Sequence, residues 1–330
     1  MAYSSADPNS FLAVGMQSGL GTPQTTLAKL RYLKYLSGTG YQAQLEVVNL
    51  REGGDGLDYG FSYKKSQKVA GQIVVNARPE SIGQLLQLLP GGATWSGASA
   101  PAVHTFHTGH ASFPYTTIFS LFPGSAIPQM LSDVRFTGFD IEAVSGEPWK
   151  LTFPFTGIQH GASFNQTLAV PSYAFEDPFL YQNSPTVVLD GAAPSGVTGW
   201  KISHGLGVEE LQALSVQLDD IVVMNRDITI EITRRFEDPT GWKKIAMGAA
   251  VSPTTSVATG SFRADSLYGA AGTLRSVSVN APLLNYEGDD LGELDPDGKT
   301  VIETITAQVM KAATSALQIV VNNAHASAYA

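Results

Sequence analysis

Alternation of apolar and polar residues with a period of two runs through most of this chain, and it constrains the fold more than any other feature of the sequence. In an extended strand successive side chains point to opposite faces, so the alternation is typical of strands with one buried face. A turn at residues 145–148 joins two alternating segments and predicts a long hairpin. We therefore expect a mainly β protein. The clearest alternating segments are residues 134–141, 149–155, 228–232, 277–281, 301–309 and 317–321.

Helical periodicity is clear at only two places, and these lie about half the length of the chain apart. The first predicted helix begins at Pro79, and the second begins at Pro239 after Asp238, a favourable N-cap. An alternating strand precedes each helix, at residues 69–77 and 228–234. We infer an internal duplication from this shared order and spacing; two unrelated core helices are the alternative. The apolar positions, which match one to one, are Ile82, Leu85, Leu86 and Leu89 in the first helix and Trp242, Ile245, Ala246 and Ala249 in the second.

Two stretches rich in Gly, Pro and polar residues divide the 330-residue chain. At about 150 residues per domain, the length itself fits two domains. We assign residues 1–30 to an N-terminal arm, 31–165 to a first domain, 166–200 to a linker and 201–330 to a second domain.

The charge distribution argues against tight binding of nucleic acid. The formal net charge is −9, and the excess acid lies in the second half, because residues 1–165 carry ten basic and ten acidic side chains while residues 166–330 carry ten and nineteen. Proteins that neutralise phosphates show the opposite balance. The densest acidic segment contains Glu287, Asp289, Asp290, Glu293, Asp295 and Asp297.

The absence of cysteine excludes disulfides, thiolate metal sites and a cysteine nucleophile, and it leaves the compartment undetermined. Residues 1–20 have neither a basic start nor a long apolar run, so we expect no signal peptide. No segment approaches the roughly 20 apolar residues of a membrane-spanning helix. We therefore expect a soluble protein.

A search for chemistry yields no catalytic, cofactor-binding or metal-ligating residues. His104 and His110 would share one strand face and His107 the other, so we expect surface imidazoles. Residues 293–298 resemble the start of a calcium loop, but Thr304 stands where a bidentate glutamate is needed, so we interpret them as an acidic turn, with weak cation binding left open. The acidic pairs at 209–210 and 219–220 could be acid and base candidates, but adjacent residues of a strand point to opposite faces and cannot share one substrate. The matches at 62–65 and 298–300 lack the companion residues that their motifs require, and the glycan acceptor pattern at 165–167 is set aside because we expect no secretory signal.

Three segments of the first half together resemble the major tail tube proteins of long-tailed, non-contractile bacteriophages. They are residues 71–86, with an Arg-Pro sequence before the helix, residues 104–106, and the hairpin of residues 136–155. The resemblance covers about residues 30–160, and the second half is assigned to the same family through the internal repeat.

The resemblance implies a β-sandwich domain flanked by one α-helix, whose sheet joins neighbouring subunits into a closed β-barrel ring. Rings of the family contain six such domains and stack into a hollow conduit for DNA. Two tandem domains per chain would then give a trimeric, pseudo-hexameric ring. The expected location is the virion tail, after assembly in the cytoplasm of the bacterial host. The implied partners are other copies of the chain, a tape-measure protein, and proteins of the tail tip and terminator, with no enzymatic activity, cofactor or membrane insertion.

Residues 50–68 predict a projecting hairpin loop that contacts the next ring, with Lys64, Lys65 and Lys68 facing acidic residues there. A merely flexible surface loop is the alternative. Net negative charge suits a channel through which DNA passes without sticking, although the segment 287–297 could equally be a solvated loop. Two other functions stay open, a β-sandwich carbohydrate- or receptor-binding virion module and an enzyme whose site is assembled from scattered residues.

Overall fold

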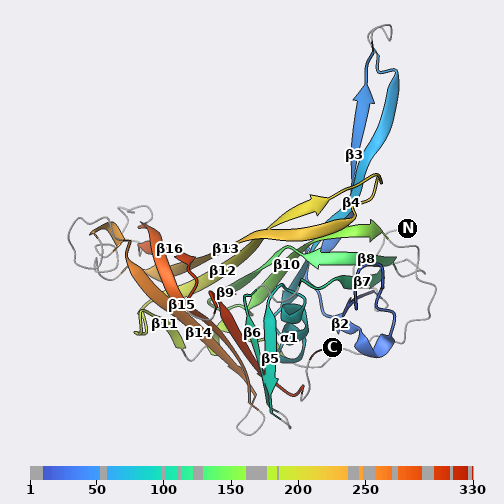
Figure 1. Cartoon of the computed structure of the whole chain (residues 1–330). Helices are drawn as coiled ribbons and strands as arrows, with labels where there is room; N and C mark the ends of the chain where they lie inside the picture. Colours follow the sequence, from blue (N-terminus) through green and yellow to red (C-terminus); the bar gives the residue numbers. More distant parts are fainter. Residues whose placement is uncertain are drawn as a thin grey trace, which may run out of the picture.

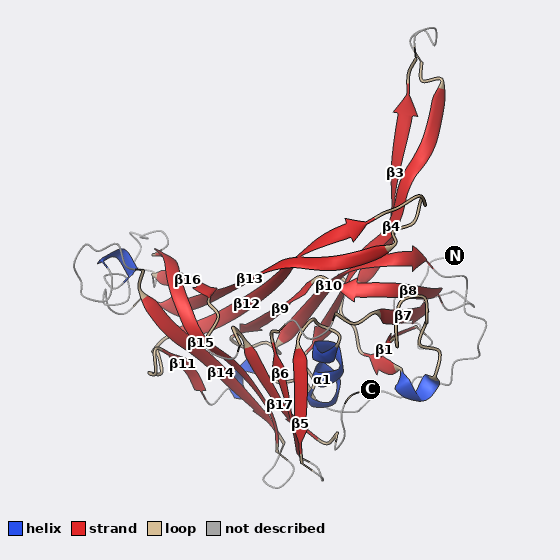
Figure 2. Ribbon diagram, viewed as in Figure 1, coloured by secondary structure: helices blue, strands red, loops and turns tan. Residues whose placement is uncertain are grey.

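The computed structural model covers the whole chain and describes residues 10–52, 58–97, 101–109, 113–121, 129–160, 177–183, 186–236, 245–247, 257–269, 274–291, 301–312, 315–325 and 329 (Figure 1). Strands dominate it, as the sequence predicts (Figure 2). The strands are β1 (Phe11–Met16), β2 (Arg31–Leu33), β3 (Gly40–Leu50), β4 (Phe61–Asn76), β5 (Gly92–Ser96), β6 (Ala102–His107), β7 (Thr116–Leu121), β8 (Gln129–Phe136), β9 (Gly138–Val144), β10 (Lys150–His160), β11 (Thr186–Leu189), β12 (Val197–Leu211), β13 (Asp220–Arg235), β14 (Thr259–Tyr268), β15 (Arg275–Asp290), β16 (Ile302–Val309) and β17 (Gln318–Asn323).

One α-helix, α1 (Pro79–Gln87), and two short 3-10 turns, η1 (Leu27–Lys29) and η2 (Tyr181–Asn183), complete the named elements. The helix begins at Pro79, as predicted, and buries Ile82 and Leu85 against the sheet. Of the second predicted helix only residues 245–247 are described, and they are helical. No helix in the described ranges is long and apolar enough to cross a membrane.

The strands form a single 17-stranded sheet whose strand pairings are antiparallel. In the first half the pairing runs from β3 through β4 and β10 to the β8–β9 segment, then through β7 and β1 to β2. In the second half it runs from β12 through β13 and β16 to β15, then through β14 to β11. The halves join where β9 pairs with β12 and where β6 pairs with β17.

The hairpins β3–β4 and β12–β13 share an irregularity at the same point. In the first, Glu46 pairs with Ser66 and the pairing resumes beyond Lys65, which is left out. In the second, Gly207 pairs with Asn225 and the pairing resumes beyond Met224, which is left out. Bulges mark specific positions in a sheet and do not arise at random. Aligned on this β-bulge, β3 corresponds to β12 and β4 to β13. The matched positions are Glu46 with Gly207, Val47 with Val208, Lys64 with Val223, Lys65 with Met224 and Ser66 with Asn225.

The later strands repeat a second irregularity. The β7–β8 pairing shifts between Thr116 and Ile118, and the β14–β15 pairing shifts between Gly260 and Phe262. The partner strands β8 and β15 change register at corresponding positions, and the same number of residues separates the two members of each corresponding pair. The corresponding positions are Val134 with Leu284 and Leu131 with Ala281.

A third irregularity also falls at matching positions of the two halves, with the same spacing along the chain that relates β8 to β15. The pairing of the β8–β9 segment with β10 changes by one residue across Gly138. The pairing of β15 with β16 changes between Tyr286 and Gly288. The order of pairing thus recurs in both halves, but the spacing between matching positions differs, being 159 to 161 residues for β3 and β4 and 144 to 150 residues for β7 and β8.

A core shared by both halves lies inside the curved sheet. Trp149 and Trp200 meet edge to face with ring centroids 4.8 Å apart, so each half contributes one tryptophan to the same contact. Phe179 is also fully buried, and its backbone bonds to both Ala77 and Trp149. The described part of the predicted linker range 166–200 therefore packs on the sheet and contains β11 and the start of β12.

Candidate assembly surfaces

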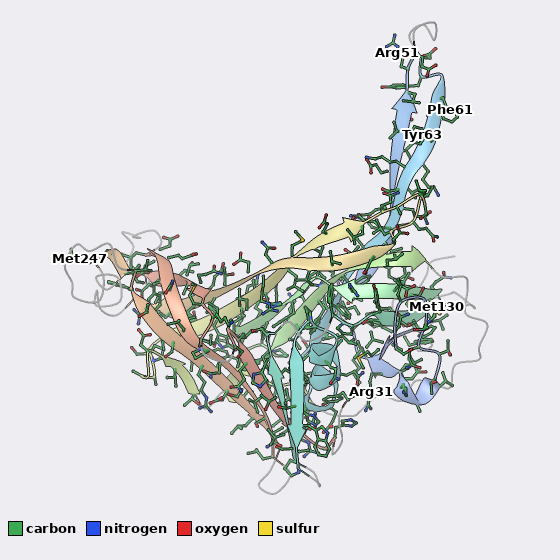
Figure 3. The ribbon with its side chains drawn as sticks, in the orientation of Figure 1. Arg31, Arg51, Phe61, Tyr63, Met130 and Met247 are labelled. Carbon is green, nitrogen blue, oxygen red and sulfur yellow. The ribbon has the colours of Figure 1, made fainter. Side chains whose placement is uncertain are left out.

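A two-stranded arm, formed by the outer parts of β3 and β4, projects from the body of the protein (Figure 1). Its tip, residues 53–57, lies outside the described residues. Phe61 and Tyr63 stack on one face of the arm with ring centroids 6.1 Å apart, and they are 61% and 41% exposed (Figure 3). An exposed aromatic pair at the end of a projecting hairpin is the kind of surface that marks a protein contact.

The basic residues of the arm are engaged within the chain. Lys65 Nζ lies 2.7 Å from Glu46 Oε1, and this charged hydrogen bond lowers the pKa of Glu46 and raises that of Lys65. Lys64 Nζ donates to Gln67 Oε1 at 3.0 Å. Lys68 binds Glu210 of β12. The sequence predicted the basic stem correctly, but its contact with another ring stays a prediction.

The base of the arm is fastened to the second half. Gln67 N donates to Val216 O at 2.8 Å, and Gln212 Nε2 donates to Lys65 O at 2.9 Å. Together with the ion pair of Lys68 and Glu210, these contacts place the arm beside the β12–β13 hairpin. Sequence reasoning missed them because no local pattern links two segments that lie so far apart in the chain.

Several strands, β2, β5 and β11 among them, have one edge with no paired strand among the described residues, and two further such stretches lie on β3 and at the end of β15. β3 pairs with β4 along its length, and its other edge has no described partner strand. β14 pairs with β15 up to Asn285, Tyr286 N donates to Ala258 O, and beside Gly288 no described strand pairs with this edge of β15. Such edges invite pairing with another chain.

Buried carboxyl groups gather where β13, β15 and β16 meet. The Arg234 guanidinium is paired with the fully buried Glu303, and both carboxyl oxygens of Asp289 are buried beside them. Burial and the neighbouring Glu303 raise the pKa of Asp289 to about 7. The densest acidic segment of the sequence begins in this part of β15, while residues 292–300 lie outside the described residues.

The acidic pairs that the sequence offered as acid and base candidates have structural partners instead. Asp220 accepts a hydrogen bond from the Tyr115 hydroxyl and forms an ion pair with Arg135 at 3.2 Å. The Arg135 guanidinium stacks over the Tyr115 ring at 3.8 Å. Asp219 Oδ2 accepts from the Ala213 backbone N–H at 2.5 Å. These contacts hold the loop between β12 and β13 against the first half.

The prediction that the histidines of β6 are surface imidazoles is wrong for His104. Its side chain is buried, its Nε2 lies 2.7 Å from the His325 carbonyl oxygen, and its ring lies 4.6 Å from that of Tyr329. His107 does lie on the opposite face, half-buried, while His110 lies outside the described residues. The error arose because the segment that covers His104 comes from the far end of the chain. Within the described ranges no group of three or more His, Asp or Glu side chains could hold a metal ion.

A largely apolar cavity of about 480 Å³ lies between α1, β6, β9 and β17. Its titratable lining residues are His107 and His204. Burial lowers the pKa of His204 to about 3, and its ring stacks on Phe139 at 4.8 Å. A neutral imidazole with no carboxylate beside it in the lining offers no acid–base pair.

A β-sheet protein whose prominent surfaces are open sheet edges and a projecting arm belongs to the class of subunits that join into larger assemblies. A family model described as phage tail tube protein matches residues 8–309. The chain therefore belongs to the phage tail tube protein family, and it is a non-enzymatic structural component of the virion tail. Membership of this family implies self-polymerisation. No curated protein matches the sequence.

Proposed function

We propose that three copies of this chain close into a ring and that the rings stack into the tube of a long, non-contractile tail. In this proposal each chain supplies two tube units, residues 31–165 and 201–330, so that three chains provide six units. The N-terminal arm of residues 1–30 and the linker of residues 166–200 connect and flank these units.

The repeated pattern of strand pairing is the observation that carries this proposal. The bulges at Lys65 and Met224 fall at matching positions of two hairpins. The register shift in β7–β8 coincides with that in β14–β15, and the change across Gly138 coincides with the change at Gly288. Irregularities that coincide in three separate pairings support two copies of one unit better than two unrelated sheets.

Surfaces of the chain described above are candidates for the contacts that a tube requires. The arm would reach the adjacent ring, where the exposed pair Phe61 and Tyr63 would be buried. DNA would pass through the channel, and the excess of acidic residues in 166–330 would limit its adhesion. A tape-measure protein, the tail-tip proteins and a terminator protein would set the start and the length of the tube in the host cytoplasm.

Light scattering combined with negative-stain electron microscopy of the purified chain tests the proposal. We expect hollow tubes or rings whose number increases with protein concentration, because ring closure and stacking are bimolecular steps. Monomers that stay dispersed at high concentration would contradict it. Such monomers binding to a glycan array would support the carbohydrate-binding alternative.

A further inference from the structure

The pairing of β9 with β12 inside one chain depends on a glycine. Gly138 pairs with Gly205, and a Cβ atom added at Gly138 would lie 2.2 Å from the His204 carbonyl oxygen. Gly138 has a positive φ of 156°, and no side chain fits at that distance, so this pairing requires glycine at residue 138. The contact continues through the pairs His204 with Phe139 and Ser203 with Asp140.

Gly288 occupies the matching position in the second half, but no described residue approaches it as closely as His204 approaches Gly138. The same number of residues separates Val134 from Leu284 and Gly138 from Gly288. Gly288 lies where the pairing of β15 with β16 changes its register. A Cβ atom added at Gly288 would meet no described atom within 4 Å, and Gly288 does not adopt the positive φ of 156° that Gly138 has. Among the described residues of the isolated chain, nothing therefore explains a glycine here.

The strand that matches β12 is β3, and its corresponding edge is open. Residues 199–205 of β12 pair with β9, and the alignment that matches Glu46 with Gly207 makes residues 38–44 their counterparts. No described strand pairs with this edge of β3. Among the described residues, the first half thus shows a strand edge with no paired strand, and the second half shows a glycine that no neighbouring backbone approaches closely.

We propose that a second copy of this chain closes this gap, with the β3 edge of one subunit pairing antiparallel to residues 288–291 of its neighbour. The proposal rests on the proposed function and adds the contact and its register. Gln44 lies opposite the neighbour's Gly288, Ala43 opposite Asp289, and Gln42 opposite Asp290. The carbonyl of Ala43 takes the place that the His204 carbonyl takes at Gly138.

The two edges lie on opposite sides of one molecule. Figure 1 shows the β3–β4 arm at one side and the β15–β16 end at the other. A contact between two different edges is heterologous, so it repeats from chain to chain and either closes into a ring or continues as a filament. Closure of the ring pairs both of these edges in every subunit.

Gly288→Ala tests the register directly. In the isolated chain the added methyl group has open space, so we expect thermal unfolding of the monomer to be unchanged. In the assembly residue 288 would take the backbone conformation of Gly138, in which an added methyl group meets the neighbour's carbonyl, and we expect the concentration needed for assembly to rise about tenfold or more. Gly92→Ala is the matched control, because Gly92 also has nothing within 4 Å and no positive φ. Assembly of Gly288→Ala at the wild-type concentration would overturn the proposal.

Disulfide cross-linking provides a second test, made simple because the chain contains no cysteine. Gln42→Cys and Asp290→Cys, made in separate chains and mixed under oxidation, should give a covalent dimer, since directly opposed residues have Cβ atoms about 5 Å apart. Glu46→Cys is the control for Gln42→Cys, because it lies four positions further along the strand, about 13 Å away. Tubes without the 42–290 cross-link would overturn this register and leave the proposed function intact. Absence of tubes from the wild-type chain would overturn the proposed function itself.

Discussion

Lys68 Nζ lies 2.7 Å from Glu210 Oε1 and 2.9 Å from Glu210 Oε2, so one ammonium group joins β4 of the first half to β12 of the second. Both side chains are about one-third exposed. The pair stands at the base of the arm, next to the hydrogen bond between Gln67 and Val216. The direction of the arm therefore depends on the second half of the chain.

Removal of this ion pair should loosen the arm more than it destabilises the protein. We expect Lys68→Ala to lower the free energy of unfolding by about 1 kcal/mol at most, because partly exposed pairs contribute little. Hydrogen exchange of residues 46–50 should accelerate, as the arm loses an anchor. Lys64→Ala, which removes the neighbouring cation that donates to Gln67 within the arm, is the control. Equal exchange rates in the two variants would contradict the anchoring role.

The aromatic pair of the arm should matter for assembly and not for folding. We expect the double variant Phe61→Ser and Tyr63→Ser to change the free energy of unfolding of the isolated subunit by less than about 0.5 kcal/mol, because both rings are largely exposed. Sedimentation should show strongly reduced tube formation, since the apolar surface that the next ring covers is lost. Wild-type levels of tubes in this variant would exclude the pair from the ring-to-ring contact.

The buried carboxyl group of Asp289 should make stability depend on pH. Its pKa is raised from 3.8 to about 7 in the folded protein, so the folded state binds this proton more tightly than the unfolded state does. Stability from this group is therefore present at low pH and is lost as the pH rises from about 4 to 7. Asp289→Asn should flatten that part of the curve and raise the melting temperature at pH 8. The difference in melting temperature between variant and wild type, measured from pH 4 to 8, checks the sign; a difference that shrinks with rising pH contradicts it.

The glycine of the internal junction should be needed for folding of the chain alone. Gly138→Ala places a methyl group against the His204 carbonyl, and we expect a loss of about 1–3 kcal/mol in the free energy of unfolding. Gly288→Ala, at the matching position with open space, should leave the isolated subunit within about 0.5 kcal/mol of wild type. Chemical denaturation of dilute, unassembled protein measures both values. Equal losses would show that the two positions do not differ as the structure indicates.

Local patterns predicted the elements whose contacts are close in sequence. The α1 helix begins at Pro79 and buries the predicted positions Ile82 and Leu85. The hairpin of β9 and β10 follows its predicted turn, with Ile141 opposite Leu151. In both cases the periodicity and the turn residues lie within about 20 residues, which is the range over which sequence patterns carry information.

Features that depend on distant segments were not predictable in the same way. His104 is covered by Tyr329 and His325, so its burial follows from where the C-terminus returns. The charge environment of Asp289 depends on the pairing of β15 with β16 and of β16 with β13. Neither contact leaves a signal in the residues that surround His104 or Asp289 in the sequence.

The proposed internal duplication lies between these two cases. Two matching predicted helix starts, at Pro79 and Pro239, are the feature of the sequence that indicated it. Only the strand registers reveal that Gly138 corresponds to Gly288, which comes earlier in the chain than the spacing of the two prolines would place it. If the halves are two copies, as we propose, insertions and deletions between them explain why a search with one fixed spacing does not match Gly138 with Gly288.

Cryo-electron microscopy of the assembled protein, with the number of chains per ring counted in end-on views and the symmetry refined, tests the central claim most directly. We predict three chains per ring, six similar sheet units around the channel, and alternating junctions in which β9 meets β12 within a chain and β15 meets β3 between chains. Six chains per ring, or a ring in which only one half of each chain contributes to the channel wall, would contradict the account.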